Sequence, residues 1–316
     1  MISAEALELA KAKLLAAAEA MAEPTPAVLL TRAERRLAAG DAAEAARLAW
    51  QAYGLDPSLD QFALLFPDVE GSPEASLGKA RALVAAGFHN ARLTEIIAFA
   101  ATRLGRFGDI RALMDQDRFL AVVRAAAPDD PDLPELAQAL QTDLAHYRSP
   151  AYRAIRHAAR REGVDEATDG PPALARMFER LRSAVGGWIA ALPADPAHPF
   201  LAGKPERFRL EGWSVVSGRK GHHTPHVHTE SWANGVFYVQ VPDAVENAEK
   251  RAGWLRVGPP ADYGVGDAEG WPERWIQPRP GLAVIMPSHF HHETRPLGAD
   301  QTRICFAFQI YPLPAV

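Results

Sequence analysis

The chain has 316 residues, of which 48% are hydrophobic and 23% charged, and its formal net charge is −5 at pH 7. This length and apolar content predict one large or two ordinary domains with substantial hydrophobic cores. The acidic balance and the lack of a basic run argue against nucleic acid as the main partner. The single cysteine excludes a disulfide within the chain and is typical of a reducing compartment.

The first residues, Met1 to Glu5, lack the basic start and the apolar core of a signal peptide. No stretch of about eighteen apolar residues occurs without a charge. We therefore expect a cytoplasmic protein without a membrane span.

Residues 1–126 are rich in alanine, leucine, arginine and glutamate and are predicted to form a helical domain. Ser3 can cap a first helix that places Leu7, Leu14 and Met21 on one stripe. Strand signals are almost absent before residue 125.

A pattern of small residues and a proline follows this first helix, and it resembles a tetratricopeptide repeat. The positions are Ala33, Gly40, Ala45, Ala52 and Pro57. In such a hairpin the small residues let two helices approach, glycine permits the turn, and proline ends the second helix. The alternative is a plain helical bundle. A repeat would offer a groove for a peptide or a surface for a homodimer.

Residues 127–150 are predicted to be a linker, because the segment from Ala127 to Pro134 concentrates proline and acidic residues. The remaining residues, 151–316, are predicted to form a second domain. Its first element is a core-facing helix, with apolar residues at helical spacing. They are Leu174, Met177, Phe178, Leu181, Val185, Trp188, Ile189 and Leu192.

Seven of the eleven histidines lie between His222 and His292. In an extended strand, His226 and His228 point to the same face, so both imidazoles can reach one ion. The adjacent pair His222 and His223 cannot both do so. Surface or purely structural histidines are the alternative to a metal site.

Two strand-like runs adjoin these histidines: residues 235–241 follow the first cluster, and residues 282–286 precede His292. Histidines at two strand ends predict a ligand site at the mouth of an antiparallel β-barrel. Trp232 and Tyr238 are close enough in sequence to line that pocket. Residues 242–279, rich in glycine and charge, are predicted to be a loop over the mouth that sets substrate choice.

A last strand is predicted at residues 302–310. Alternation places small or polar residues on one face of this strand: Arg303, Cys305, Ala307 and Gln309. The other face carries the apolar residues that pack in the core: Ile304, Phe306, Phe308 and Ile310. A guanidinium near a histidine-bound ion suits a ligand with a carboxylate at each end, because one end can chelate the metal while arginine pairs with the other.

These motifs resemble the iron(II)- and 2-oxoglutarate-dependent dioxygenases, whose signature is H-x-D/E, a distal histidine, and then R-x-S after ten residues. Here the matching positions are His226-x-His228, His292 and Arg303. Further strings resemble one bacterial branch of oxygenases: Gly212-Trp-Ser-Val-Val216, Pro225-His-Val-His228, Ser231-Trp-Ala-Asn-Gly-Val-Phe-Tyr-Val239, Gly253-Trp254, Pro280-Gly281, Met286-Pro-Ser288 and His292-Glu-Thr-Arg-Pro296. The resemblance covers roughly residues 145–316.

The resemblance implies an α+β protein in which the helical domain precedes a double-stranded β-helix, or jelly-roll barrel, with flanking helices. It implies Fe(II) held by His226, His228 and His292, with 2-oxoglutarate and O2 as co-substrates. Arg303 would bind the far carboxylate of 2-oxoglutarate, with Cys305 and Tyr238 beside it. The activity implied is hydroxylation of a peptide, a protein or a small molecule.

Two positions depart from the family signature. His228 stands where most members have an acid, which makes a ligand set one unit more positive. If His228 turned aside, Glu230 could replace it, provided that the strand continued regularly. Cys305 stands in place of serine and removes a hydrogen bond of about 1 kcal/mol.

Two other classes of protein fit part of this pattern. A cupin-type metalloenzyme that does not use 2-oxoglutarate would share the histidines and the Gly281 to Pro287 spacing, but it has no need of Arg303. An interaction protein that has lost catalysis together with the acid is the other alternative.

Overall fold

The computed structural model of the protein describes residues 24–56, 71–141, 154–260 and 271–313, and the single residues 13, 66 and 69. The chain divides into two compact units, Met1–Arg106 and Phe107–Val316. Within the described residues, no helix has both the length and the apolar character that crossing a bilayer requires.

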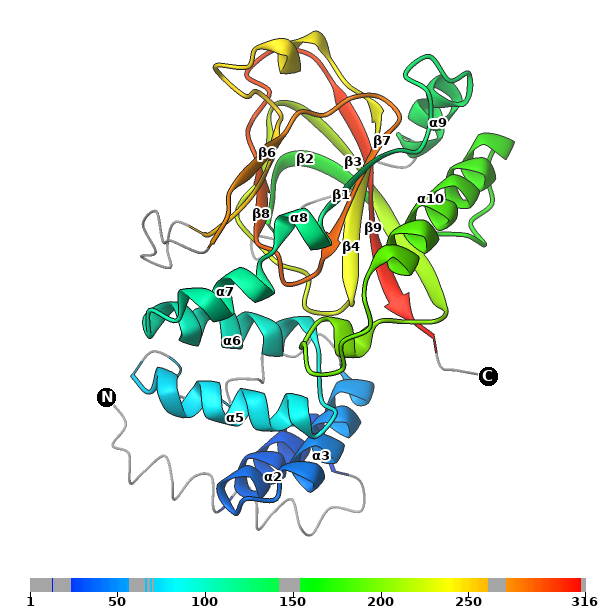
Figure 1. The fold of residues 1–316 in the computed structure, drawn as a ribbon. Helices are drawn as coiled ribbons and strands as arrows, with labels where there is room; N and C mark the ends of the chain where they lie inside the picture. Colours follow the sequence, from blue (N-terminus) through cyan, green and yellow to red (C-terminus); the bar gives the residue numbers. More distant parts are fainter. Residues whose placement is uncertain are drawn as a thin grey trace. The chain divides into compact units, whose positions relative to one another are not determined.

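The first unit is helical, as predicted. The helices whose bounds the structure gives are α2 (Pro26–Ala38), α3 (Ala42–Leu55), α5 (Pro73–Ala85) and α6 (Ala91–Arg103) (Figure 1). Helix α2 packs on α3, and α5 packs on α6. The predicted first helix, with Ser3, Leu7, Leu14 and Met21, lies outside the described residues.

The α2–α3 hairpin uses the small residues as the sequence predicts. Ala33, Ala45 and Ala52 are fully buried, and Gly40 between the helices has a φ of 81°, a left-handed conformation that suits glycine. Pro57, the last position of the pattern, lies outside the described residues. The hairpin is therefore confirmed, and its assignment to the tetratricopeptide class stays a prediction.

The second unit contains the strands. They are β1 (Ala121–Arg124), β2 (Ile155–Asp165), β3 (Phe208–His223), β4 (Ala233–Gln240), β5 (Leu255–Val257), β6 (Arg274–Ile276), β7 (Leu282–Pro287), β8 (His292–Thr294) and β9 (Arg303–Pro312). The strands form a large sheet in the order β1-β7-β4-β9-β3-β2 and a small sheet in the order β6-β5-β8. Every pairing is antiparallel.

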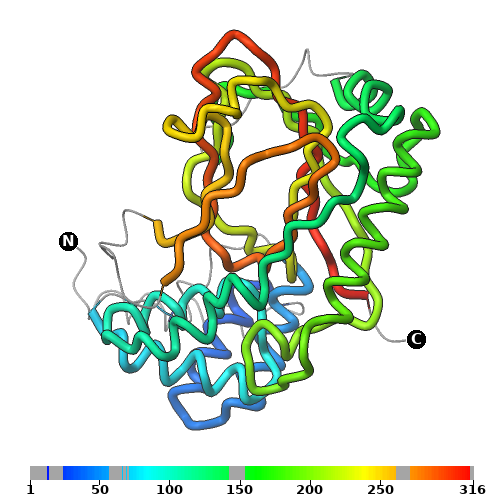
Figure 2. The backbone as a smooth tube through the Cα atoms, turned by 45° about the horizontal axis from the view of Figure 1, so that its top comes forward, coloured from blue at the N-terminus to red at the C-terminus, as the bar shows by residue number. Residues whose placement is uncertain are grey.

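The two sheets enclose one cavity, which is lined by residues of β2, β3, β4 and β9 from the large sheet and of β5 and β8 from the small sheet. Figure 2 shows the backbone of this unit curving into a barrel-like arrangement. Flanking helices and two facing antiparallel sheets are the arrangement that the predicted jelly-roll requires.

The described helices of this unit are α7 (Phe107–Leu113), α8 (Gln116–Phe119), α9 (Asp132–Leu140) and α10 (Pro172–Ala191), with 3-10 turns at η2 (Leu201–Gly203) and η3 (Asp243–Glu246). Helix α10 is the helix predicted from the apolar stripe. Its Phe178 ring meets the ring of Phe306 on β9 edge-on, with centroids 5.4 Å apart. Trp188 is 7% exposed and donates its Nε1–H to the Phe119 carbonyl at 3.1 Å, so its predicted packing role is confirmed.

The alternation predicted for the last strand is confirmed by β9. Arg303, Cys305, Ala307 and Gln309 line the cavity. The opposite set, Ile304, Phe306, Phe308 and Ile310, is almost completely buried. Because β9 pairs with both β3 and β4, it lies at the centre of the large sheet and carries its polar face into the cavity.

The two compact units divide the chain after Arg106, whereas the sequence predicts boundaries at residues 126 and 150. Strand β1, in a region expected to lack strands, pairs with β7 and so belongs to the large sheet. Helix α9 lies in the segment expected to be a linker, and Asp132 at its start pairs with Arg176 of α10 at 2.5 Å. Proline and acidic residues here mark the first turn of a helix as readily as a linker.

Gly235 of β4 permits a close approach in the centre of the sheet. A Cβ at this position would lie 2.4 Å from Cζ of Phe308 and 2.5 Å from the Val284 carbonyl oxygen. We expect Gly235→Ala to lower the free energy of unfolding by about 1–3 kcal/mol, because a backbone atom cannot move aside as a flexible side chain can. Denaturant unfolding measures this change.

Gly218→Ala is the matched control for that variant. Gly218 lies in β3 of the same sheet, and a Cβ there would meet no atom within 4 Å. The control should unfold like the wild type. An unchanged stability of Gly235→Ala would contradict the tight approach.

Candidate active site

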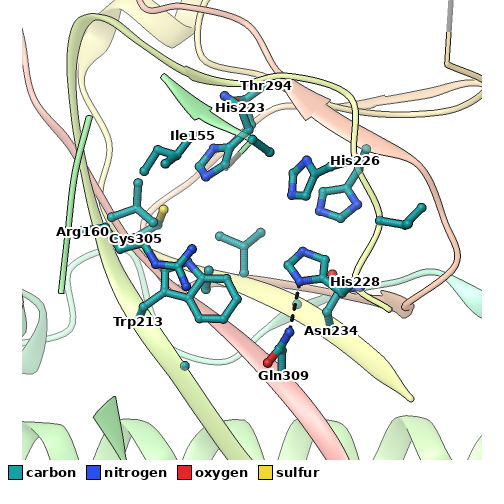
Figure 3. A pocket seen from close by; sticks show the side chains of 18 of the residues that line it. Ile155, Arg160, Trp213, His223, His226, His228, Asn234, Thr294, Cys305 and Gln309 are labelled. Carbon is teal, nitrogen blue, oxygen red and sulfur yellow. Dashed lines mark hydrogen bonds between the residues drawn. The ribbon is translucent and has the colours of Figure 1, made fainter. Parts of the chain in front are cut away.

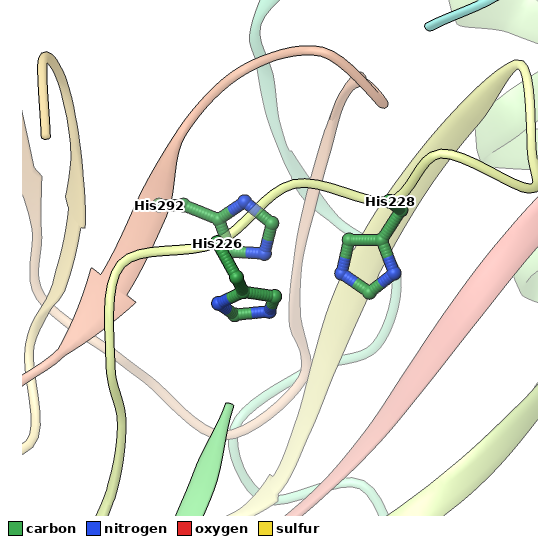
Figure 4. A group of neighbouring side chains, drawn as sticks. All are labelled: His226, His228 and His292. Atoms are coloured by element: carbon green, nitrogen blue, oxygen red, sulfur yellow. The ribbon is translucent and has the colours of Figure 1, made fainter. Parts of the chain in front are cut away.

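Three histidines meet at the cavity wall. His226 and His228 come from the segment between β3 and β4, and His292 begins β8. One ring nitrogen from each lies within 4.8 Å of the others. Figure 4 shows the three rings around one space. The predicted ligand trio is therefore brought together, and three nitrogen donors of this kind suit a divalent iron, zinc, nickel or copper ion.

Backbone hydrogen bonds fix the positions of all three histidines. His226 and His292 exchange two of them, from His226 N to His292 O at 3.1 Å and from His292 N to His226 O at 3.0 Å. The His228 N–H donates to the Ser288 carbonyl at 2.9 Å. The histidine segment is thus tied to the loop between β7 and β8, which explains why residues about sixty positions apart meet.

The imidazoles of His226 and His292 are oriented by backbone carbonyls. Nδ1 of His226 lies 2.8 Å from the Thr224 carbonyl oxygen, and Nδ1 of His292 lies 2.9 Å from that of Phe290. A carbonyl can only accept, so Nδ1 carries the proton in each ring and Nε2 keeps its lone pair. Both rings have the tautomer that a metal ligand at Nε2 needs.

Burial keeps the three rings neutral. It lowers the pKa of His226 and His228 well below the usual range, and it lowers the pKa of His292 to about 4. A metal ligand must be unprotonated. At neutral pH the three rings are therefore uncharged.

Glu230, the alternative ligand, does not join this cluster. The chain turns at residues 229 and 230, so regular strand alternation ends after His228, and Glu230 is exposed. Among the described residues, the group able to hold an ion consists of His226, His228 and His292. The third donor is an imidazole where the family signature has an acid.

The remaining histidines of the two clusters have other surroundings. His222 points its Nδ1 to the Lys220 carbonyl, whereas His223 lines the cavity and stacks on His226, with ring centroids 5.6 Å apart. The predicted divergence of this adjacent pair is confirmed. His289 is buried, with Nε2 3.2 Å from the Leu113 carbonyl oxygen, which is a packing role.

Arg303 lies on the cavity side of β9 and is only 1% exposed. Its Nη1 donates to the Gly253 carbonyl at 2.6 Å. Its Nε has no hydrogen-bond partner in the part of the chain that the structure describes. A buried guanidinium with a donor left over is suited to an anionic ligand, because pairing with a carboxylate would compensate its desolvation.

Two polar groups accompany Arg303 on the same face. Tyr238 of β4 stands opposite Cys305, and Ser217 of β3 stands opposite Arg303. The Tyr238 hydroxyl and the Ser217 hydroxyl are both buried without a hydrogen-bond partner among the described residues. Burial raises the pKa of Tyr238, so its hydroxyl stays a donor. Together with Arg303 Nε, these groups place three buried polar atoms without a hydrogen-bond partner among the described residues on one face of the sheet.

Another part of the cavity has an aromatic and charged wall that the sequence did not predict. Trp213 of β3 stacks on His228, with ring centroids 5.8 Å apart. The guanidinium carbon of Arg160 lies 3.9 Å from the centre of the Trp213 ring (Figure 3). Arg160 also pairs with Glu162 at 2.5 Å. The string Gly212-Trp-Ser, one of those shared with the family, could have indicated that Trp213 belongs to the site. Strand β2, which carries Arg160, has charges on both faces and gives no strand signal.

Two predictions about the pocket are wrong. Trp232 does not line it but stacks on Phe200, with ring centroids 4.6 Å apart, and donates to the Phe200 carbonyl, because it lies in the bend before β4 begins. The predicted loop 242–279 contains η3, β5 and β6, of which β5 supplies cavity wall at Leu255. Residues 261–270 of that loop lie outside the described residues.

The fold and the site together define a class: a double-sheet antiparallel barrel that holds a histidine cluster and a buried arginine in one cavity of about 480 Å³. Residues 211–309 match the family described as "Putative 2OG-Fe(II) oxygenase". This segment includes the three histidines, Tyr238 and Arg303. The resemblance stated from the sequence is therefore confirmed for residues 211–309, and within this segment the three histidines are able to hold a metal ion.

Several solved structures are similar to parts of this chain. A prolyl-4-hydroxylase from Pseudomonas putida is 16% identical with a TM-score of 0.42, over 65% of this chain and 100% of that chain. A prolyl hydroxylase from Trichoplax adhaerens, in complex with a hypoxia inducible factor peptide, is 12% identical with a TM-score of 0.43, over 66% and 90%. HygX from Streptomyces hygroscopicus, with nickel and 2-oxoglutarate bound, is 12% identical with a TM-score of 0.38, over 64% and 86%. The chain matches no curated protein sequence.

Proposed function

We propose that the protein is a non-haem Fe(II)- and 2-oxoglutarate-dependent dioxygenase that hydroxylates a peptide, a protein or a small molecule. The observation that carries the proposal is the presence of three neutral imidazoles and one buried guanidinium in the same cavity. The metal ligands are His226, His228 and His292.

The residues present fit both groups. Imidazole nitrogens are suitable ligands for ferrous iron. Arg303 Nε and the Tyr238 hydroxyl are buried donors without a partner within the described residues, and a dicarboxylate with one end at the histidines offers acceptors to both. Cys305 adds a thiol to this end of the cavity. Burial raises its pKa, so the thiol stays neutral and does not repel a carboxylate.

Iron and 2-oxoglutarate together supply oxidation of an unactivated C–H bond: one atom of O2 enters the substrate as a hydroxyl group, and the other enters succinate as CO2 is released. The chain's own residues bind and orient the reactants. Arg303, which is buried in the cavity wall, holds the far carboxylate of 2-oxoglutarate, and Tyr238 donates to it. The wall of Trp213 and Arg160 is left for the substrate.

The helical unit is proposed to serve the same reaction. As a tetratricopeptide-like region it would hold a peptide or a second copy of the chain, which favours a peptide or protein substrate. The buried small residues of the α2–α3 hairpin support this assignment.

Metal content and succinate release test the proposed function together. The protein is reconstituted anaerobically with Fe(II) and then given 2-oxoglutarate and O2, with and without a panel of peptides and small molecules. We expect about one bound ion and iron-dependent release of succinate. Bound metal without succinate would favour the cupin-type alternative, and absence of both would favour a non-catalytic interaction protein.

A further inference from the structure

The third histidine differs from the other two in what holds its ring. His228 Nδ1 lies 3.3 Å from Nε2 of Gln309, a side chain on the cavity face of β9 (Figure 3). His226 and His292 use backbone carbonyls at the same position of the ring. Gln309 is 8% exposed and cannot easily turn to solvent. The His228 ring therefore meets a side-chain amide where the other two rings meet a backbone carbonyl. His228 is also the residue that stands in place of the acid of the family signature.

The polarity of this hydrogen bond is opposite to that of the other two. An amide Nε2 can only donate, so Nδ1 of His228 accepts, and the single proton of the neutral ring lies on Nε2. Nε2 is the nitrogen left to reach an ion, because Gln309 occupies Nδ1. In this arrangement the ring presents N–H and not a lone pair to the metal position.

The Gln309 amide can face His228 with either its nitrogen or its oxygen, because its partner at the other end can both donate and accept. The Tyr311 hydroxyl donates to Gln309 Oε1, and the Tyr311 ring is held in place by the Arg209 guanidinium, whose carbon lies 4.0 Å from the ring centre. A phenol can donate or accept. If the amide turns over, Tyr311 accepts from Nε2, and Oε1 faces His228.

We propose that Gln309 is a positioning residue for the third metal ligand, and that its amide turns over when the metal binds. In the structure described here Gln309 donates to Nδ1. In the metal-bound protein Oε1 accepts from Nδ1–H, the proton on Nε2 is lost to solvent while Nδ1 takes one up, and the ring stays neutral. This inference rests on the metal centre proposed above.

A carboxylate at position 309 should make this switch unnecessary. Glutamate can only accept, so it fixes the proton on Nδ1 and leaves Nε2 free, and it returns a negative charge to a site that lacks the usual acid. We expect Gln309→Glu to bind Zn(II) about 10-fold more tightly than the wild type. Gln309→Leu, which removes the partner, should bind about 10- to 100-fold more weakly.

Gln301→Glu is the matched control. Gln301 is exposed, precedes the same strand, and uses its Oε1 to accept from the Ala244 N–H. The control adds the same charge and keeps that acceptor, so its Zn(II) affinity should equal that of the wild type. A rise in Zn(II) affinity in both glutamate variants would assign the effect to net charge and overturn the inference.

The tautomer of His228 is a second readout, measured on the wild-type protein and independent of activity. In full-length protein labelled with 15N-histidine, the His228 signals, assigned from a His228→Ala spectrum, should show Nε2–H without metal and Nδ1–H with Zn(II). Nδ1–H in both states would overturn the turning of the amide.

The outcomes separate this inference from the proposed function. Failure of the wild-type protein to bind Zn(II) would overturn the metal centre, and the inference would fall with it. Binding by the wild type with equal affinity in both Gln309 variants would overturn the inference alone. Tighter binding in Gln309→Glu, weaker binding in Gln309→Leu and a change of tautomer would support it.

Discussion

Alanine at His226 or His292 should abolish the binding of Fe(II). Each ring supplies one of only three donors in the cluster, and their nitrogens lie within 4.8 Å of one another. Removing a ligand should weaken Fe(II) binding by more than the roughly 10- to 100-fold that follows removal of a ligand's hydrogen-bond partner. Metal analysis after anaerobic reconstitution measures the result. A full complement of iron in either variant would show that the ion lies elsewhere.

His228 provides the comparison within this set. His228→Ala should lose most of the affinity, whereas His228→Asp restores the common set of two histidines and one carboxylate and should keep the metal while turnover of 2-oxoglutarate without substrate changes. His222→Ala is the matched control, because that ring is turned to the Lys220 carbonyl and lies outside the cluster. Equal iron affinity in the two His228 variants and the wild type would contradict a ligand role for His228.

Arg303→Ala should weaken 2-oxoglutarate binding by roughly 2 to 4 kcal/mol, or about 30- to 1000-fold. The variant leaves the far carboxylate of the ligand partly desolvated and without its partner, in a cavity where Arg303 is 1% exposed. Metal binding should be spared, because the three histidines belong to other segments. Titration calorimetry on the metal-loaded protein measures the affinity.

Arg256→Ala is the control for that variant. Arg256 lies on β5 of the same barrel and pairs with Glu273 and Glu293, at 2.7 and 3.0 Å, outside the cavity. It should bind 2-oxoglutarate like the wild type. An unchanged affinity in Arg303→Ala, with its metal retained, would exclude Arg303 as the anchor.

The parts of the site that the sequence could predict are those with a simple periodicity. Two-residue alternation along β9 was enough to place Arg303 and Cys305 in the cavity and Phe306 against α10. The pair His226 and His228 followed from the same rule. The two histidine-bearing strand ends predicted that the clusters meet, but the choice of His292 within the second cluster needed the family resemblance.

Other features depend on three-dimensional neighbours that no local pattern records. Strand β2 carries charges on both faces, so Arg160 could not be placed beside Trp213. Strands β5 and β6 have three residues each and lie among glycines and prolines, which are typical of loops. The contact of Gln309 with His228 depends on how far β9 extends relative to the histidine segment, and this is set by pairing across the sheet.

The reciprocal backbone bonds between His226 and His292, with that from His228 to Ser288, have a thermodynamic consequence. Because these hydrogen bonds order the backbone of the three histidines, we expect the protein to fold without the ion. Small zinc domains differ, since they unfold when a chelator removes their metal. Binding then adds stability only by mass action, as RT ln(1 + [ion]/Kd). We therefore expect the protein to stay folded when a chelator removes the ion and to bind the ion again when it is returned.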